Sequence, residues 1–272
     1  MAIVSINFSD RKTLQDYYSK VDLSFWDKEV ARCLDLMLKK DVSDRNDVIR
    51  LYSTYIQLIE VFFLNVFAIT ENNLAPLFIG NTQLRELIEV QGGLKEYKEY
   101  FFENWVFGVL EKQVINNYSN KREFYSRLYD ELIDDYLQDY DLLNAYKHGF
   151  RTHASGPAEI SLCPDGEPGK RMRVAEYDSS IVFFSQGTKR DKNKEVIYES
   201  MICFNWRYIA QKSQVILSML ENTKKILLAN GEKIELTTLF ELENHLKGLY
   251  GVFRIRQPLY KLSDVSTDRR DK

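Results

Sequence analysis

The spacing of hydrophobic residues changes at residues 149–157, and this change constrains the fold more than any other feature of the chain. From Ser24 to His148, apolar residues recur every three or four positions, the spacing of one face of an α-helix. After Pro157, short runs alternate between apolar and polar residues, which is typical of β-strands. Helical spacing returns at Trp206. The sequence therefore predicts helices on both sides of a short β segment.

The predicted helices before residue 149 are joined by short links, which implies an antiparallel bundle. The most apolar of them contains the run Tyr55 to Ile69, which is too short to span a bilayer and includes Gln57, Glu60 and Asn65. We therefore predict a buried central helix and no membrane segment. The helical segments cover about 24–37, 45–69, 83–90, 94–117 and 121–148.

Four short runs with strand character follow the glycine- and proline-rich turn, and they predict a small antiparallel β-meander. They are Glu159–Cys163, Arg171–Tyr177, Ile181–Ser185 and Val196–Cys203. The predicted fold class is mostly α, an antiparallel helical bundle with this meander inserted. The predicted divisions are a bundle at 1–155, the meander at 156–203, helices completing the bundle at 204–250, and a tail at 251–272.

Composition and charge limit the functions that the chain can have. Its 272 residues carry 37 basic and 40 acidic side chains, a balance that gives no general attraction to nucleic acids or membranes. Cys33, Cys163 and Cys203 are odd in number and far apart, which predicts reduced thiols in a cytoplasmic protein. The chain has no pairs of Cys or His at the spacing of zinc ligands, so no zinc site is predicted. It also has no glycine-rich phosphate-binding loop, so no nucleotide cofactor is predicted.

The candidate chemical site lies where the last helix before the β segment ends. A helix reaching this point places Asn144 and His148 on one face, with Lys147 and Arg151 nearby. Histidine can transfer a proton while a neighbouring cation stabilises phosphorane charge, so these residues suit phosphodiester cleavage. The alternative is an ordinary helix end, at which the macrodipole favours histidine and Gly149 stops the helix.

The motif from Asn144 to His148, "NAYKH", resembles the Asn-x-x-x-His core of HEPN-type domains. The resemblance implies a helical bundle, a homodimer and, in many members of the family, a metal-independent RNase with an Arg-x(4–6)-His motif. In this chain the positions that would hold that arginine are Asp141, Leu142 and Leu143. The resemblance therefore implies a binding or dimerisation module, in which Lys147 or Arg151 would have to replace the missing arginine for catalysis.

Basic residues in the predicted hairpin loops form a second candidate site, for nucleic acid. Lysine and arginine side chains next to strands that carry aromatic residues can bind the phosphate backbone of a nucleic acid. Acidic and basic residues nearly balance between positions 156 and 200, so the patch exists only if the loops converge, and solvated turns are the alternative. The candidates are Lys170, Arg171, Arg173, Lys189 and Arg190.

An acidic stretch covers residues 130–141. Glu131 and Asp134 share a helical face, and such pairs can hold Mg²⁺ when other carboxylates face them. Leu132, Tyr136 and Leu143 mark the buried side of the same helix, so we predict a solvated acidic face and no metal site.

These features favour a HEPN-like, non-catalytic module acting in nucleic-acid-linked bacterial defence or stress. One alternative is a metal-independent RNase that uses His148. Another is a scaffold protein that binds a protein partner through the β-meander. The expected partners are a second copy of the chain and an RNA or a protein, without a cofactor.

Overall fold

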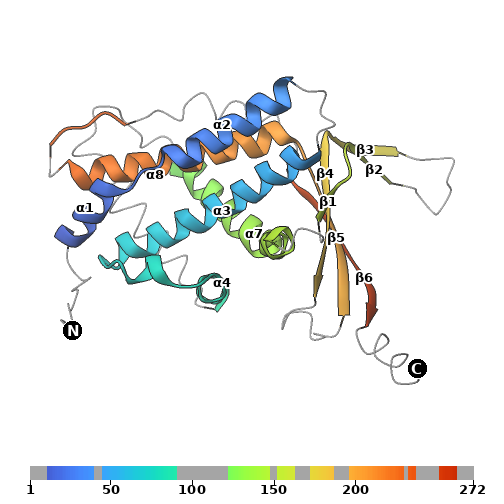
Figure 1. Cartoon of the computed structure of the whole chain (residues 1–272), viewed down its shortest axis with the longest axis horizontal. Helices are drawn as coiled ribbons and strands as arrows, with labels where there is room; N and C mark the ends of the chain where they lie inside the picture. Colours follow the sequence, from blue (N-terminus) through green and yellow to red (C-terminus); the bar gives the residue numbers. More distant parts are fainter. Residues whose placement is uncertain are drawn as a thin grey trace. The chain divides into compact units, whose positions relative to one another are not determined.

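The computed structural model describes residues 11–39, 45–90, 122–147, 152–162, 172–186, 196–229, 232–236 and 251–261. The elements in these residues are α1 (Arg11–Lys20), α2 (Ser24–Lys39), α3 (Arg45–Thr70), the 3-10 turn η1 (Ala75–Phe78), α4 (Asn81–Val90), α7 (Arg122–Lys147), α8 (Trp206–Leu228), β1 (Thr152–Ala154), β2 (Ala158–Leu162), β3 (Met172–Tyr177), β4 (Ser179–Gln186), β5 (Val196–Phe204) and β6 (Phe253–Lys261) (Figure 1). Both helices and strands are therefore major elements of the described chain.

The predicted fold class, a mostly α bundle with a small inserted meander, is wrong. The described strands form two antiparallel sheets, of four and of two strands, and the fold is of the mixed α+β type. The error arises from β1 and β6, which join β4 and β5 to widen the expected hairpin into a four-stranded sheet. The segment Phe253–Lys261 carries two arginines and a proline, and we had expected it to belong to the tail.

Several individual elements are confirmed. The predicted helices at 45–69 and 121–148 correspond to α3 and α7, and strands β2 to β5 lie within a few residues of the four predicted runs. The helix expected at 94–117, and residues 237–250 of the segment expected to complete the bundle, lie outside the described residues.

The chain divides into two units, each built from three segments. Unit 1 contains the described parts of Met1–Lys28, Ile56–Gln138 and Ser213–His245, and unit 2 those of Glu29–Tyr55, Asp139–Lys212 and Leu246–Lys272. Helices α2, α3, α7 and α8 contribute residues to both units, whereas all six described strands belong to unit 2.

Unit 1 has an aromatic core around α3. The rings of Phe62 and Phe63 meet Tyr129 of α7 edge to face, with centroids 6.1 and 5.3 Å apart. The hydroxyl of Tyr18 on α1 donates a hydrogen bond to the side chain of Asn65. The aromatic pairs of Phe62 and Phe63 with Tyr129 add to the hydrophobic free energy gained by burying these large rings.

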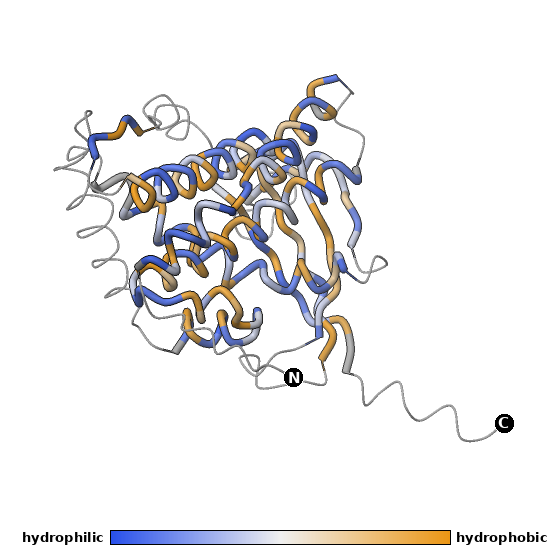
Figure 2. Tube along the Cα trace, turned by 60° about the vertical axis from the view of Figure 1, so that its left-hand side comes forward, coloured by the Kyte–Doolittle hydropathy of each residue, from blue (hydrophilic) through white to orange (hydrophobic). Residues whose placement is uncertain are grey.

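Helix α3 is long and apolar enough to cross a membrane, by length and composition alone. In the chain, however, 72% of its most apolar stretch is buried against other residues. This burial is what the core helix of a water-soluble protein shows, and it agrees with the prediction of a buried central helix. Figure 2 shows that hydrophobic residues, in orange, interleave with hydrophilic ones along both helices and strands.

Unit 2 is organised by the four-stranded antiparallel sheet, whose strand order is β1-β4-β5-β6. Successive side chains of a strand point to opposite faces, and residues paired across strands share a face. Ile181 and Phe183 of β4 are buried, and Ile181 is paired with Ile202, which is paired with Arg254. These residues define the inner face of the sheet. Tyr52 of α3 packs on this face, 4.5 Å from the ring of Phe204.

Candidate functional site

The predicted chemical site at the end of α7 is only partly within the described residues. Helix α7 ends at Lys147, and Asn144 and Lys147 are both exposed on its last turn. His148 and Arg151 lie outside the described residues. The hypothesis that these four residues form a phosphodiester-cleaving cluster therefore stays a prediction.

Of the five basic residues proposed to bind nucleic acid, the structure describes Arg173, on β3. Its guanidinium forms ion pairs with Glu176 of the same strand and with Glu159 of β2, the latter at 3.8 Å. Two neighbouring carboxylates thus offset its positive charge. Lys170, Arg171, Lys189 and Arg190 lie outside the described residues.

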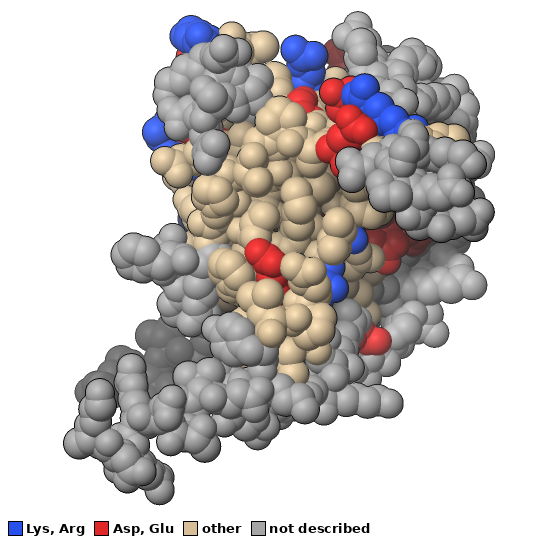
Figure 3. Space-filling view, turned by 90° about the vertical axis from the view of Figure 1, so that its right-hand side faces the viewer, with Lys and Arg blue, Asp and Glu red and all other residues tan. Residues whose placement is uncertain are grey.

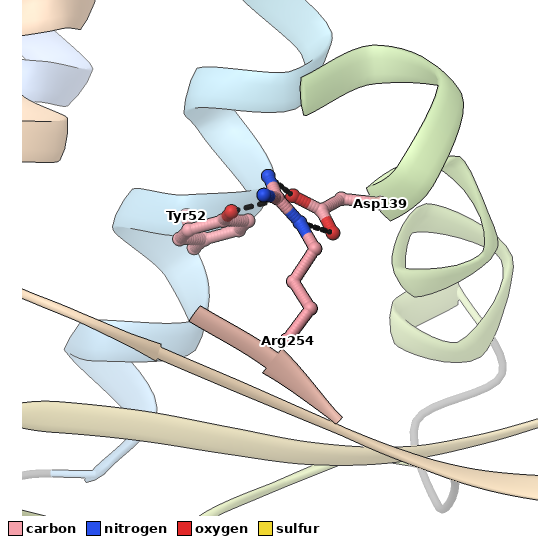
Figure 4. Close-up of polar contacts among 3 residues, drawn as sticks. All are labelled: Tyr52, Asp139 and Arg254. Atoms are coloured by element: carbon pink, nitrogen blue, oxygen red, sulfur yellow. Dashed lines mark hydrogen bonds and ion pairs between the residues drawn. The ribbon is translucent and has the colours of Figure 1, made fainter. Parts of the chain in front are cut away.

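The carboxylate of Asp139, on α7, is a buried polar group of unit 2 and is 1% exposed. Arg254 of β6 donates hydrogen bonds from Nε to Oδ1 at 2.7 Å and from Nη2 to Oδ2 at 2.6 Å. The hydroxyl of Tyr52 on α3 donates a third to Oδ2 at 2.6 Å. Figure 4 shows the three side chains converging from two helices and a strand. A bidentate guanidinium with a further donor can hold a buried carboxylate ionised.

A second arginine of β6 lies on the same face of the sheet, two residues beyond Arg254. The guanidinium of Arg256 stands 4.1 Å from the ring centroid of Tyr198 and 4.0 Å from Asp141 of α7. Its contacts are longer and more exposed than those of Arg254, so they contribute less to stability. Together the two arginines attach the inner face of β6 to the end of α7.

One prediction from the sequence is corrected by this arrangement. The acidic stretch 130–141 was predicted to be a solvated face, but Asp135 and Asp139 are buried. Asp139 lies three residues after Tyr136 and four before Leu143, on the apolar side of the helix that the sequence had identified. Sequence reasoning missed this site, although the signal was a carboxylate at apolar spacing. Among the described residues, no group of three His, Cys, Asp or Glu side chains could hold a metal ion.

The start of α8 is held by two acceptors. Asn205 Oδ1 accepts the backbone N–H of Arg207 at 3.0 Å, as a helix N-cap does, and Asp178 Oδ1 accepts that of Trp206 at 3.0 Å. Partial burial raises the pKa of the Asp178 carboxyl, and the hydrogen bond from Trp206 opposes that rise. Asp178 thus ties the turn between β3 and β4 to the helix that follows β5.

Two of the three cysteines, Cys33 and Cys203, are free and buried. Burial, with the nearby Glu29 carboxylate, raises the pKa of the Cys33 thiol to about 11. Burial also raises the pKa of Cys203. Both thiols are therefore protonated and poorly nucleophilic at neutral pH. Cys163 lies outside the described residues.

The face of the sheet opposite Arg254 exposes hydrophobic side chains. Phe184 of β4 and Ile255 of β6 are 37% and 45% exposed, and Phe253 is also exposed. By strand register the same face carries His153, Val182, Glu199, Met201 and Gln257, and we call these eight residues the outer face. Ser180 and Cys203, which share this face at the Phe253 end, are buried and are not part of the exposed area. Figure 3, turned toward the strands of Figure 1, shows a broad area of uncharged residues with few Lys, Arg, Asp and Glu. Exposed apolar side chains gathered on one face, such as Phe184, Phe253 and Ile255, typically mark an interaction surface.

No protein-family model matches the chain, and no curated protein and no solved structure is significantly similar to it. The resemblance to HEPN-type domains therefore rests on the Asn144–His148 motif alone and stays a hypothesis.

Proposed function

We propose that this chain is a protein-interaction module that binds its partner through the outer face of the four-stranded sheet. The observation that carries the proposal is the exposure of Phe184, Phe253 and Ile255 on one face. An antiparallel sheet with one solvated face normally presents polar side chains to water. Large apolar side chains in these positions are stabilised when another protein covers them.

The inner face supports the same assignment because it makes the sheet a stable platform. Arg254 joins β6 to the buried carboxylate of Asp139, and Tyr52 joins that carboxylate to α3. A binding surface on strands fixed in this way loses little conformational entropy when it meets a partner. Because Glu159 and Glu176 offset the positive charge of Arg173, protein binding is favoured over nucleic-acid binding through the β2–β3 hairpin.

Affinity capture with a paired set of variants tests the proposal. The variant Phe184→Thr/Ile255→Thr removes apolar surface but keeps β-branched side chains that suit a strand. Val174→Thr, at an exposed position of β3 in the other sheet, is the matched control. We expect a partner captured by wild type and by the control to be retained roughly tenfold less by the double variant. Equal retention by all three proteins would contradict the proposal.

A further inference from the structure

We propose that a second copy of this chain binds the outer face, so that two four-stranded sheets stack face to face about a two-fold axis. This inference rests on the proposed function, because it names the partner of the same surface. The two copies would pack sheet on sheet and would not pair at a strand edge.

The dimensions of the outer face suit such a dimer. Strands β4 and β5 have 8 and 9 residues. Strand β6 has 9 residues and β1 only 3. With about 3.3 Å per residue and about 4.8 Å between strands, the three long strands β4, β5 and β6 cover roughly 400 Å² in projection. Side chains standing out of the sheet make the accessible area larger than its projection. The result is of the same order as the ~800 Å² per partner of a standard interface.

The charges on the outer face are compatible with its own copy. Glu199 is the one carboxylate among the eight outer-face residues, and it accepts a hydrogen bond from Gln257 Nε2 at 2.6 Å. His153 lies at the opposite side of the sheet, on β1, and is exposed. Two stacked copies therefore bring no array of like charges together, which would otherwise oppose association.

A two-fold axis parallel to the strands gives these two residues complementary positions. In aligned stacking, β1 of one copy lies over β6 of the other, and β4 lies over β5. His153 and Glu199 of opposite copies then become diagonal neighbours across the interface. Within one chain they lie two strands and one register row apart, roughly 10 Å or more. Contact between them is thus specific to the dimer.

The edge of the sheet is a poorer site for a second copy. Pairing two β6 strands antiparallel would bring Arg254 and Arg256 of both copies onto the same face, opposite one another. Pro258 has no N–H to donate to a neighbouring strand. Inward-facing charges and proline are the devices by which proteins protect sheet edges from pairing. Of the β6 edge and the outer face, the outer face is therefore the better site for a second copy.

Sedimentation equilibrium of the full chain over a concentration series tests the inference. We expect a concentration-dependent dimer for the wild type and for Val174→Thr, and a dissociation constant at least tenfold higher for Phe184→Thr/Ile255→Thr. Far-UV circular dichroism and thermal unfolding show whether each variant keeps the fold. A wild type that stays monomeric, or a dimer that the double variant leaves unchanged, overturns the inference.

A charge exchange provides a second test that does not remove apolar surface. Glu199→Lys should raise the dissociation constant by removing the carboxylate that lies next to His153 of the other copy, and His153→Glu should raise it by placing two carboxylates together. The double variant His153→Glu/Glu199→Lys should recover at least tenfold relative to Glu199→Lys. Additive losses would overturn the two-fold geometry that we propose.

The outcome separates this inference from the proposed function. If the wild type is monomeric but captures a different protein in a manner that depends on Phe184 and Ile255, the second copy is wrong and the interaction module stands. If the wild type neither dimerises nor captures any protein through these residues, both proposals fail.

Discussion

Arg254 and Asp139 lie 115 positions apart in the sequence and form a bidentate ion pair that joins strand β6 to helix α7. The carboxylate is buried, whereas the arginine side chain is 21% exposed. The side chains of β6 on the outer face are solvent-exposed, so they contribute little buried area. Besides the antiparallel ladder with β5, this pair therefore attaches the last described strand to α7.

Replacing Arg254 by alanine should destabilise the protein by about 3–5 kcal/mol, because the buried carboxylate of Asp139 loses its counter-charge. Arg256→Ala is the matched control on the same strand face. Its partner Asp141 is 4.0 Å away and its side chain is 35% exposed, so we expect a loss of only about 1 kcal/mol. Urea unfolding followed by tryptophan fluorescence measures both values.

The same pair should tolerate joint replacement by apolar residues. The variant Tyr52→Phe/Asp139→Leu/Arg254→Met removes both charges and the buried hydroxyl that would lose its acceptor, and we expect it to recover most of the stability lost in Arg254→Ala. A triple variant as unstable as Arg254→Ala would show that the ion pair itself, and not the uncompensated carboxylate, sets the cost.

Tyr52→Phe should cost roughly 1.5–3 kcal/mol, because it removes one hydrogen bond to the ionised carboxylate of Asp139 and leaves the ring in place. Contact of that ring with Phe204 is preserved. Tyr198→Phe keeps a ring beneath Arg256 and serves as the control, with an expected loss below about 0.5 kcal/mol. Equal losses in the two variants would contradict a special role for the Tyr52 hydroxyl.

Local periodicity predicted the helices and strands better than it predicted their assembly. Alternation along β4 and β5 and the apolar stripe of α3 are properties of neighbouring residues, and the structure confirms these elements. The partnership of Asp139 with Arg254 joins distant segments and leaves no local pattern. Strand β6 was missed although Phe253 to Arg256 alternate between apolar and polar residues, because the alternation is short and is followed by Pro258.

The candidate site shows the same limit. Asp139 was read as one of six acids on a solvated helix, although its spacing from Tyr136 and Leu143 places it on the buried side. A carboxylate at apolar spacing predicts a buried partner, but the sequence does not say which cation supplies it. The outer face was equally hidden, because exposure of Phe184 and Ile255 depends on which face of the sheet the helices of unit 2 cover.

The buried cysteines should resist thiol reagents in the native protein. In a Cys163→Ser background, an aromatic disulfide reagent at pH 8 should label Cys33 and Cys203 slowly, since burial keeps both thiols protonated. Labelling in denaturant should be complete and fast, which provides the control. Rapid native labelling would contradict the burial of these residues.

Asp178 should make the stability depend on pH. The pKa of the Asp178 carboxyl in the folded protein is raised above its usual 3.8. At pH values between the pKa of the unfolded chain and that of the folded protein, the native state therefore binds more of the proton than the unfolded chain does. The contribution of Asp178 to the free energy of unfolding therefore falls as pH rises through that window.

Asp178→Asn keeps an oxygen acceptor for the Trp206 N–H but does not titrate. We expect its stability relative to the wild type to increase from pH 4 to pH 7, as measured by urea unfolding. Asp178→Ala, which also loses the acceptor, should follow the same pH dependence and lie roughly 1 kcal/mol below Asp178→Asn at each pH. A difference between Asn and wild type that does not change with pH would contradict a raised pKa at Asp178.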